Sequence, residues 1–159
     1  MLAKSRSAAF TQISLAIACA VLCVVFLCAA AVAPAVADGI SPGLWKVTET
    51  VVMNGAPAPP QTKTRCLSAE QAADTAATFS PEYRTINSDC ERAEYESTAS
   101  KLKWRFLCKG QLDMDVSGDF TFDTAKHYSA KIESKGAVGG RTVAETSVAI
   151  EGEHLGECQ

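Results

Sequence analysis

The chain has 159 residues, of which 47% are hydrophobic and 21% are charged, and its formal net charge at pH 7 is −3. Lys4 and Arg6 are the only charged residues before Asp38, so removing their +2 from −3 leaves −5 for residues 38–159. An acidic domain lacks the basic face that a phosphate backbone requires, which excludes a nucleic-acid-binding protein.

The first 37 residues are typical of a secretion signal. Lys4 and Arg6 precede a stretch from Ser7 to Ala37 without a charge or a histidine, and the stretch ends in Ala35-Val36-Ala37. A basic start, an apolar core and a small-x-small end predict cleavage after Ala37. Residues 38–159 are then a single exported domain, periplasmic or otherwise outside the cytoplasm.

Two other fates of this leader stay open. Its apolar core, Ile13 to Val32, is as long as a membrane-spanning helix, so the alternative is an uncleaved anchor that leaves the domain facing the periplasm. In that case the N-terminal segment alone contacts the membrane. Lipid attachment at a cysteine is disfavoured, because Cys23 and Cys28 each follow a leucine where the signal needs a small residue.

The domain opens with two predicted strands. Residues 44–53 alternate, with Trp45 and Val47 on one face and Lys46 on the other, as in a half-buried strand; Glu49 alone breaks the pattern. Residues 54–60, NGAPAPP, combine a turn signal with three prolines and predict a loop. A second strand at residues 61–67 is expected to pair with the first.

One short helix is predicted near residues 69–75. Ser68 has a glutamine, Gln71, three residues later, which is the spacing of a capping box. Leu67 and Ala72 are placed to form the hydrophobic staple that accompanies it. The stretch from Ala76 to Asp89 shows no clear pattern and is expected to be irregular.

The remaining residues predict hairpins. Segments 90–97 and 101–108 form one around residues 98–100, and the second alternates cleanly, with Trp104, Phe106 and Cys108 inward. Further strands are expected around residues 113–122, with a bulge at Gly118, around 128–132, and at 144–150 after a loop at 136–140. The predicted fold class is all-β, an antiparallel meander of about seven strands forming a curled sheet or partial barrel.

Four of the seven cysteines lie in the exported domain: Cys66, Cys90, Cys108 and Cys158. An even number of cysteines in a small exported domain favours two disulfides. A zinc site is disfavoured because no Cys-x-x-Cys spacing occurs among them.

Strand parity predicts how these cysteines pair. If Ala93 and Tyr95 face the core together with Trp104 and Phe106, paired residue numbers sum to odd values, whereas a bridge between Cys90 and Cys108 needs an even sum. Parity thus disfavours one of the three possible pairings. Of the three, the expected one is Cys66 with Cys90, which would staple the helix-containing excursion to the sheet, and Cys108 with Cys158, which would pin the C-terminal tail. A β-bulge in either strand would reverse this parity.

Three formal motif matches are attributed to chance. The G-x-S-x-G pattern at residues 39–43 lacks the preceding strand and following helix of a nucleophile elbow. The calcium-loop pattern that begins at Asp113 has Thr124 where a bidentate glutamate belongs. His154 beside Cys158 is better explained by the disulfide count than by a metal. No catalytic, metal-binding or cofactor-binding residue is predicted, and a hydrolase remains a distant alternative.

The residues together resemble a known family. Its features are Pro42-Gly43-Leu44-Trp45, Cys66-Leu67, Cys90, the segment Trp104 to Cys108, and Gly156-Glu157-Cys158. This resembles the bacterial exported family catalogued as domain of unknown function 3617, over nearly all of residues 40–158. The resemblance implies export and disulfides, and supplies no catalytic residues. The chain departs from the family at residues 54–60, which replace a methionine-rich hairpin tip.

Two functional hypotheses remain. The first is a non-enzymatic envelope protein that binds an apolar or amphipathic small molecule, or a protein partner, on the concave face of the sheet. The second is a structural or interaction domain whose filled core leaves only its surface to act. Both rest on the same aromatic set, whose members either face a ligand or fill the core: Trp45, Trp104, Phe106, Phe120 and Phe122.

Overall fold

Strands dominate the described part of the chain. The computed structural model describes residues 39–82 and 88–158, so the predicted leader and its cleavage site after Ala37 lie outside it. Within these ranges no helix has the length and apolar character needed to cross a membrane. In chain order the elements are β1 (Gly43–Met53), β2 (Ala56–Pro57), β3 (Gln61–Leu67), α2 (Ala69–Ala73), α3 (Thr75–Phe79), β4 (Ser88–Ser97), β5 (Lys101–Gly110), β6 (Asp113–Thr124), β7 (His127–Val138) and β8 (Arg141–Gly156).

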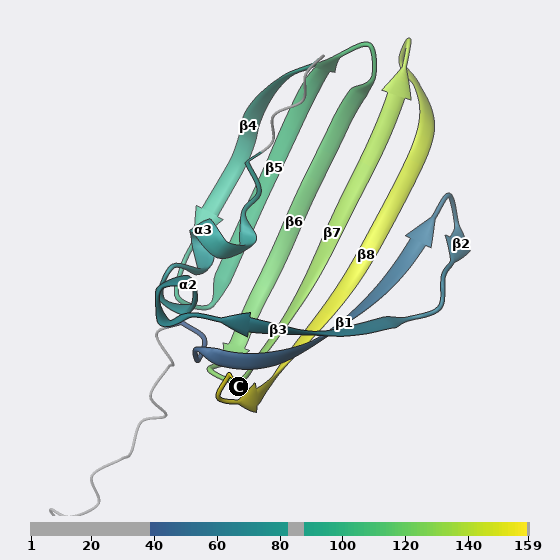
Figure 1. Cartoon of the computed structure of the whole chain (residues 1–159). Helices are drawn as coiled ribbons and strands as arrows, with labels where there is room; N and C mark the ends of the chain where they lie inside the picture. Colours follow the sequence, from purple (N-terminus) through teal and green to yellow (C-terminus); the bar gives the residue numbers. More distant parts are fainter. Residues whose placement is uncertain (1–38, 83–87, 159) are drawn as a thin grey trace, which may run out of the picture. The chain divides into compact units, whose positions relative to one another are not determined.

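The strands form one antiparallel sheet. Its order is β2-β1-β8-β7-β6-β5-β4, and β3 pairs with β1 on the same side as β2. From β4 to β8 the chain is a meander, and residues 146–156 of β8 then pair with β1. The sheet curls so that β3 crosses the ends of β6 and β7 in Figure 1. The predicted all-β curled sheet is confirmed, with eight strands because β2 is separate from β3.

Alternation along the strands separates an inner face from an outer face. The outer face carries mostly charged and polar side chains, as expected for a sheet that is solvated on one side. The inner face carries the buried core. Its strand residues are Trp45, Val47, Leu67, Leu102, Trp104, Phe106, Cys108, Val116, Phe120, Phe122, Tyr128 and Ala130.

Two short helices follow β3 and cover part of the inner face (Figure 1). The predicted capping box is confirmed: Ser68 Oγ accepts from the Gln71 amide at 3.2 Å, and Gln71 Oε1 accepts from the Ser68 amide at 3.0 Å. Helix α2 ends at Ala73, because Asp74 caps the next helix by accepting from the Ala77 amide at 2.8 Å. Helix α3 was not predicted, so the expectation that residues 76–89 are irregular is wrong for residues 76–79.

Two further details of the meander differ from the sequence prediction. Gly118 pairs with Trp104 on one side and Ile132 on the other without a register shift, so the predicted bulge there is wrong. The expected loop at 136–140 is shorter, because β7 continues to Val138. Gly139 and Gly140 alone make the turn, with φ of 56° and 75°.

Candidate functional site

An aromatic cluster on the inner face is organised around Phe79 of α3. Its ring centroid lies 5.4 Å from that of Phe120, 5.6 Å from Phe122 and 5.1 Å from Tyr128. The Phe79 carbonyl also accepts a buried hydrogen bond from Trp104 Nε1 at 3.1 Å. A short helix is marginal alone, so these contacts hold α3 against β5 and β6. The sequence-based set of aromatics did not include Phe79.

The five predicted aromatics all face inward and are buried, but they divide between the wall of a cavity and the packed core. Trp104 and Phe120 line a cavity. Trp45, Phe106 and Phe122 belong to the packed core and are not part of its lining. The inner face is therefore partly core and partly open wall.

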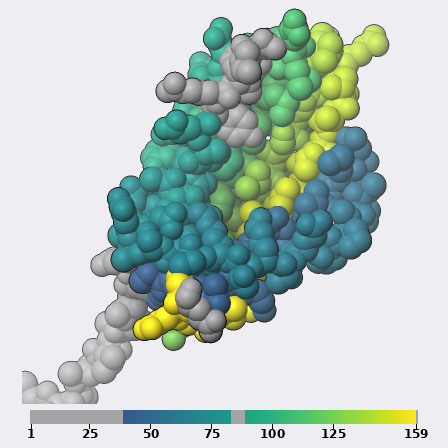
Figure 2. Space-filling view, viewed as in Figure 1, coloured from purple at the N-terminus to yellow at the C-terminus, as the bar shows by residue number. Residues whose placement is uncertain are grey.

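The cavity has a volume of about 360 Å³, within the range of about 300 to 1,000 Å³ typical of ligand pockets. Figure 2 shows the hollow, with β7 and β8 in green and yellow visible between the helices and the β1–β2 end. Its wall is mainly apolar and its rim comes from β3 and the end of α3. The lining residues are Val47, Lys63, Arg65, Thr78, Phe79, Ser80, Pro81, Trp104, Phe120, Tyr128, Ile132 and Ile150.

Two basic side chains of β3 stand at the rim of the cavity. The register of β3 against β1 places Lys63 opposite Val47 and Arg65 opposite Trp45, so both point to the inner face. Lys63 Nζ lies 2.6 Å from Glu49 Oε1, which explains why an acidic residue occupies the apolar face of β1. The Arg65 guanidinium lies 5.8 Å from the centroid of the Phe79 ring.

Two hydroxyl groups complete the polar part of the lining. Burial raises the pKa of Tyr128 above its ordinary value of about 10, while the nearby Arg65 opposes the shift. The Tyr128 hydroxyl is therefore uncharged at neutral pH and is suited to hydrogen bonding. The Ser80 hydroxyl is buried and has no hydrogen-bond partner among the described residues.

The lining offers binding groups but no combination that would activate a nucleophile. Among the described residues it contains no histidine, cysteine or carboxylate, and its titratable groups there are one lysine, one arginine and a tyrosine that burial keeps protonated. Across residues 39–82 and 88–158, no three histidine, cysteine, aspartate or glutamate side chains converge as metal ligands would. The arrangement can hold a molecule that is apolar at one end and polar at the other.

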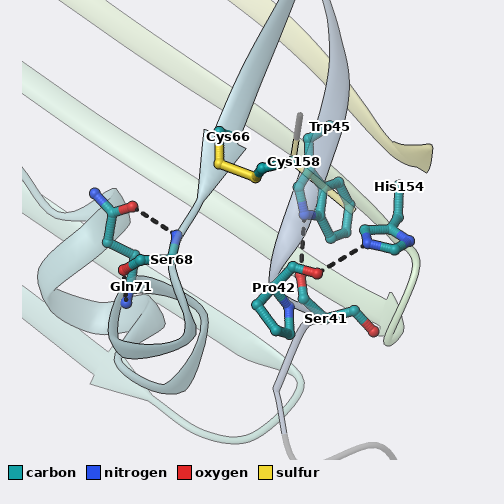
Figure 3. Close-up of a disulfide and its surroundings, with 8 residues drawn as sticks. All are labelled: Ser41, Pro42, Trp45, Cys66, Ser68, Gln71, His154 and Cys158. Carbon is teal, nitrogen blue, oxygen red and sulfur yellow. Dashed lines mark hydrogen bonds between the residues drawn. A yellow bond between two sulfur atoms is a disulfide. The ribbon is translucent and has the colours of Figure 1, made fainter. Parts of the chain in front are cut away.

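The residues of the G-x-S-x-G match have a structural role at the start of β1 (Figure 3). The Ser41 carbonyl accepts from Trp45 Nε1 at 3.0 Å, and the Pro42 carbonyl accepts from His154 Nε2 at 3.0 Å. Gly43 has φ of 131°, and a Cβ there would overlap the Gly156 carbonyl. The segment thus fastens the entry of β1 to the end of β8.

The disulfides differ from the predicted pairing. Cys66 is bonded to Cys158 and Cys90 to Cys108, so the expected Cys66–Cys90 and Cys108–Cys158 bridges are wrong. The reason is a register shift in β4 between Arg92 and Glu94, which leaves Ala93 without a partner. Tyr95 faces Trp104 with the predicted odd sum, but beyond the bulge Cys90 faces Cys108 directly. Two disulfides indicate an oxidising, exported environment.

The outer face holds a second hollow of about 530 Å³, over β4 to β7. Its charges are largely neutralised by one another: Arg105 donates to both Asp115 carboxylate oxygens at 2.9 and 2.8 Å and to Glu94 at 3.1 Å. The hydrogen bond from Arg105 lowers the pKa of Asp115. The aspartates of the calcium-loop match are thus strand residues that alternate with the core, as the sequence indicates.

Comparisons with known proteins place the chain in a family without an assigned activity. The model of the family described as "Protein of unknown function (DUF3617)" matches residues 40–158, which confirms the resemblance drawn from the sequence. Comparisons with curated proteins and with solved structures found no match.

Proposed function

This chain belongs to the family of proteins of unknown function DUF3617, and we propose that it is a non-enzymatic exported protein that binds an apolar or amphipathic small molecule in the inner cavity. The observation that carries the proposal is the cavity itself, a space of about 360 Å³ among otherwise well-packed aromatic side chains. A core filled by these aromatics, which the second hypothesis requires, would leave no such space.

The partial exposure of the aliphatic wall supports the same role. Ile132 and Ile150 line the cavity and pack against the core without being fully buried. Water next to such a surface is displaced favourably by an apolar ligand, at about 25 cal/mol for each Å² removed from water. The two disulfides stabilise the open sheet in an oxidising compartment, where a small-molecule carrier can work.

Native mass spectrometry of protein purified without detergent from its own host tests the proposal. We expect a bound molecule that leaves on denaturation. Ile150→Trp should remove it by filling the cavity, whereas Ala149→Trp, one residue earlier on the outer face, should retain it.

The result that would overturn the proposal has two parts. One is a clean mass without ligand in independent preparations. The other is the absence of a complex with either of two added amphiphiles, uncharged ω-bromododecanol and anionic ω-bromododecanoic acid. Together they would favour the purely structural or interaction domain.

A further inference from the structure

The cavity has an electrostatic character opposite to that of the chain. The chain is acidic, with a formal charge of −3, yet among the described residues the only charged ones in the cavity lining are Lys63 and Arg65. Both are exposed at the rim, on the same face of β3. An anion is therefore favoured at this opening over a cation or a neutral group.

The pairing of these two side chains leaves one positive charge. Glu49 forms an ion pair with Lys63 at 2.6 Å. Arg65 has no ion pair with a carboxylate in the described ranges 39–82 and 88–158, where its guanidinium lies over the Phe79 ring and near Tyr128. The net charge of the described rim residues therefore matches a head group with a single negative charge.

The position of Arg65 over Phe79 suits it to hold such a head group. The Arg65 Cζ lies 5.8 Å from the centroid of the Phe79 ring, a cation–π contact that uses none of the guanidinium N–H donors. These donors form a fork that fits a carboxylate with two parallel hydrogen bonds.

The buried end of α3 supplies a second polar group. Ser80 follows α3 and lines the cavity, and its buried hydroxyl lacks a hydrogen-bond partner among the described residues. Buried polar groups in proteins almost always have a partner. A polar atom of a bound molecule would satisfy this hydroxyl, and the rest of the wall, formed by Trp104, Phe120 and Ile150, would contact its apolar part.

We infer that the ligand is an anionic amphiphile with a single charge, whose carboxylate or similar head group is bound by Arg65 while its apolar part lies against the cavity wall. This inference rests on the proposed function, because it specifies the class of molecule that the inner cavity takes. It assigns Arg65 as the residue that determines specificity for charge.

The test compares two probes that differ in the head group, ω-bromododecanoic acid and ω-bromododecanol. Bromine quenches a nearby indole, and the chain has two tryptophans, of which Trp104 lines the cavity and Trp45 does not. In a Trp45→Phe background the quenching of Trp104 gives the dissociation constant of each probe. We expect the acid to bind about 10- to 100-fold more tightly than the alcohol, as a charge-assisted hydrogen-bonded pair implies.

Two arginine variants separate the specific contact from general charge. Arg65→Gln should weaken binding of the acid about 10- to 100-fold and leave binding of the alcohol unchanged. Arg92→Gln is the matched control, because Arg92 also stacks on aromatic rings, 4.6 Å from Tyr95 and 5.4 Å from Phe106, but does not line the cavity. It should leave both constants within about twofold.

The outcomes distinguish the two proposals. Equal affinity for acid and alcohol, unaffected by Arg65→Gln, would overturn the inference and leave the binding function intact. An equal loss in both arginine variants would also overturn it, since it would mean that only the overall charge matters. Failure of both probes to quench Trp104 in the folded protein would count against the binding function itself.

Discussion

Gly118 and Gly152 each lie beneath an aromatic ring of the cavity wall. A Cβ at Gly118 would overlap the Trp104 ring, and a Cβ at Gly152 would overlap the Tyr128 ring. Each glycine lies directly opposite its aromatic partner in the neighbouring strand. The missing side chains leave the space against the sheet that the two rings occupy.

Replacing these glycines should therefore destabilise the protein. Gly118→Ala and Gly152→Ala should each lower the free energy of unfolding by about 1–3 kcal/mol, because the rings must leave their packed positions. Urea titration followed by circular dichroism measures the change. Gly136→Ala is the control, since its nearest neighbours are the flexible ends of Met114 at 3.3 Å and Leu112 at 3.4 Å. A loss no larger than that of the control would contradict the overlap.

His127, which follows the turn between β6 and β7, contacts two carboxylates. Its Nδ1 lies 2.8 Å from Asp123 Oδ1, and its Nε2 lies 3.1 Å from Glu151 Oε2. The hydrogen bond with Asp123 is the main reason that the pKa of His127 is raised, and the same contact lowers the pKa of Asp123.

These shifts predict how stability changes with pH. The contribution of His127 is complete below its unfolded pKa of about 6.5 and is lost as pH rises through its higher folded pKa. That of Asp123 is complete above about 3.9 and is lost as pH falls through its lower folded pKa. The cluster thus stabilises most between these two values.

We expect His127→Gln to cost more stability at pH 5.5 than at pH 8.5. Because the cluster is more than a third exposed, the difference should not exceed about 1 kcal/mol. Urea titrations of both proteins at the two pH values measure it. A larger cost at pH 8.5 would show that the histidine does not act through its charge.

The strands and helices that could be predicted from the sequence are those that a short stretch of residues determines by itself. Apolar and charged residues alternate along β5, which indicates directly that one face of the strand is buried. Its inward residues Leu102, Trp104 and Phe106 are buried as expected. The start of α2 was equally clear, because the Ser68 and Gln71 side chains that cap it lie within three residues.

The errors occurred where distant residues decide the local structure. Helix α3 has five residues, too few for a helical period to be visible, and Phe79 anchors it to strands far along the chain. The β4 bulge at Ala93 has no glycine or proline to signal it. The cavity depends on β3 curling over β6 and β7, so its rim residues Lys63 and Arg65 could not be identified from their own segment.

At the scale of the molecule, the two disulfides hold the two edges of the sheet. Cys90–Cys108 fastens β4, the edge strand beside β5, while Cys66–Cys158 joins β3, at the other edge, to the tail that follows β8. An edge strand has a neighbour on one side only and is the first to detach. The predicted Cys66–Cys90 bridge would instead link β3 to β4, so this disulfide would join the two opposite edges of the sheet to each other.

Tryptic mapping under non-reducing conditions tests this arrangement. Cleavage after lysine and arginine puts each cysteine on a separate peptide, residues 66–84, 85–92, 106–109 and 142–159. We expect 66–84 linked to 142–159 and 85–92 linked to 106–109, with both linked masses absent after reduction. A peptide joining 66–84 to 85–92 would show that the two edges are tied to each other, and the open inner face on which the binding site depends could not exist in this form.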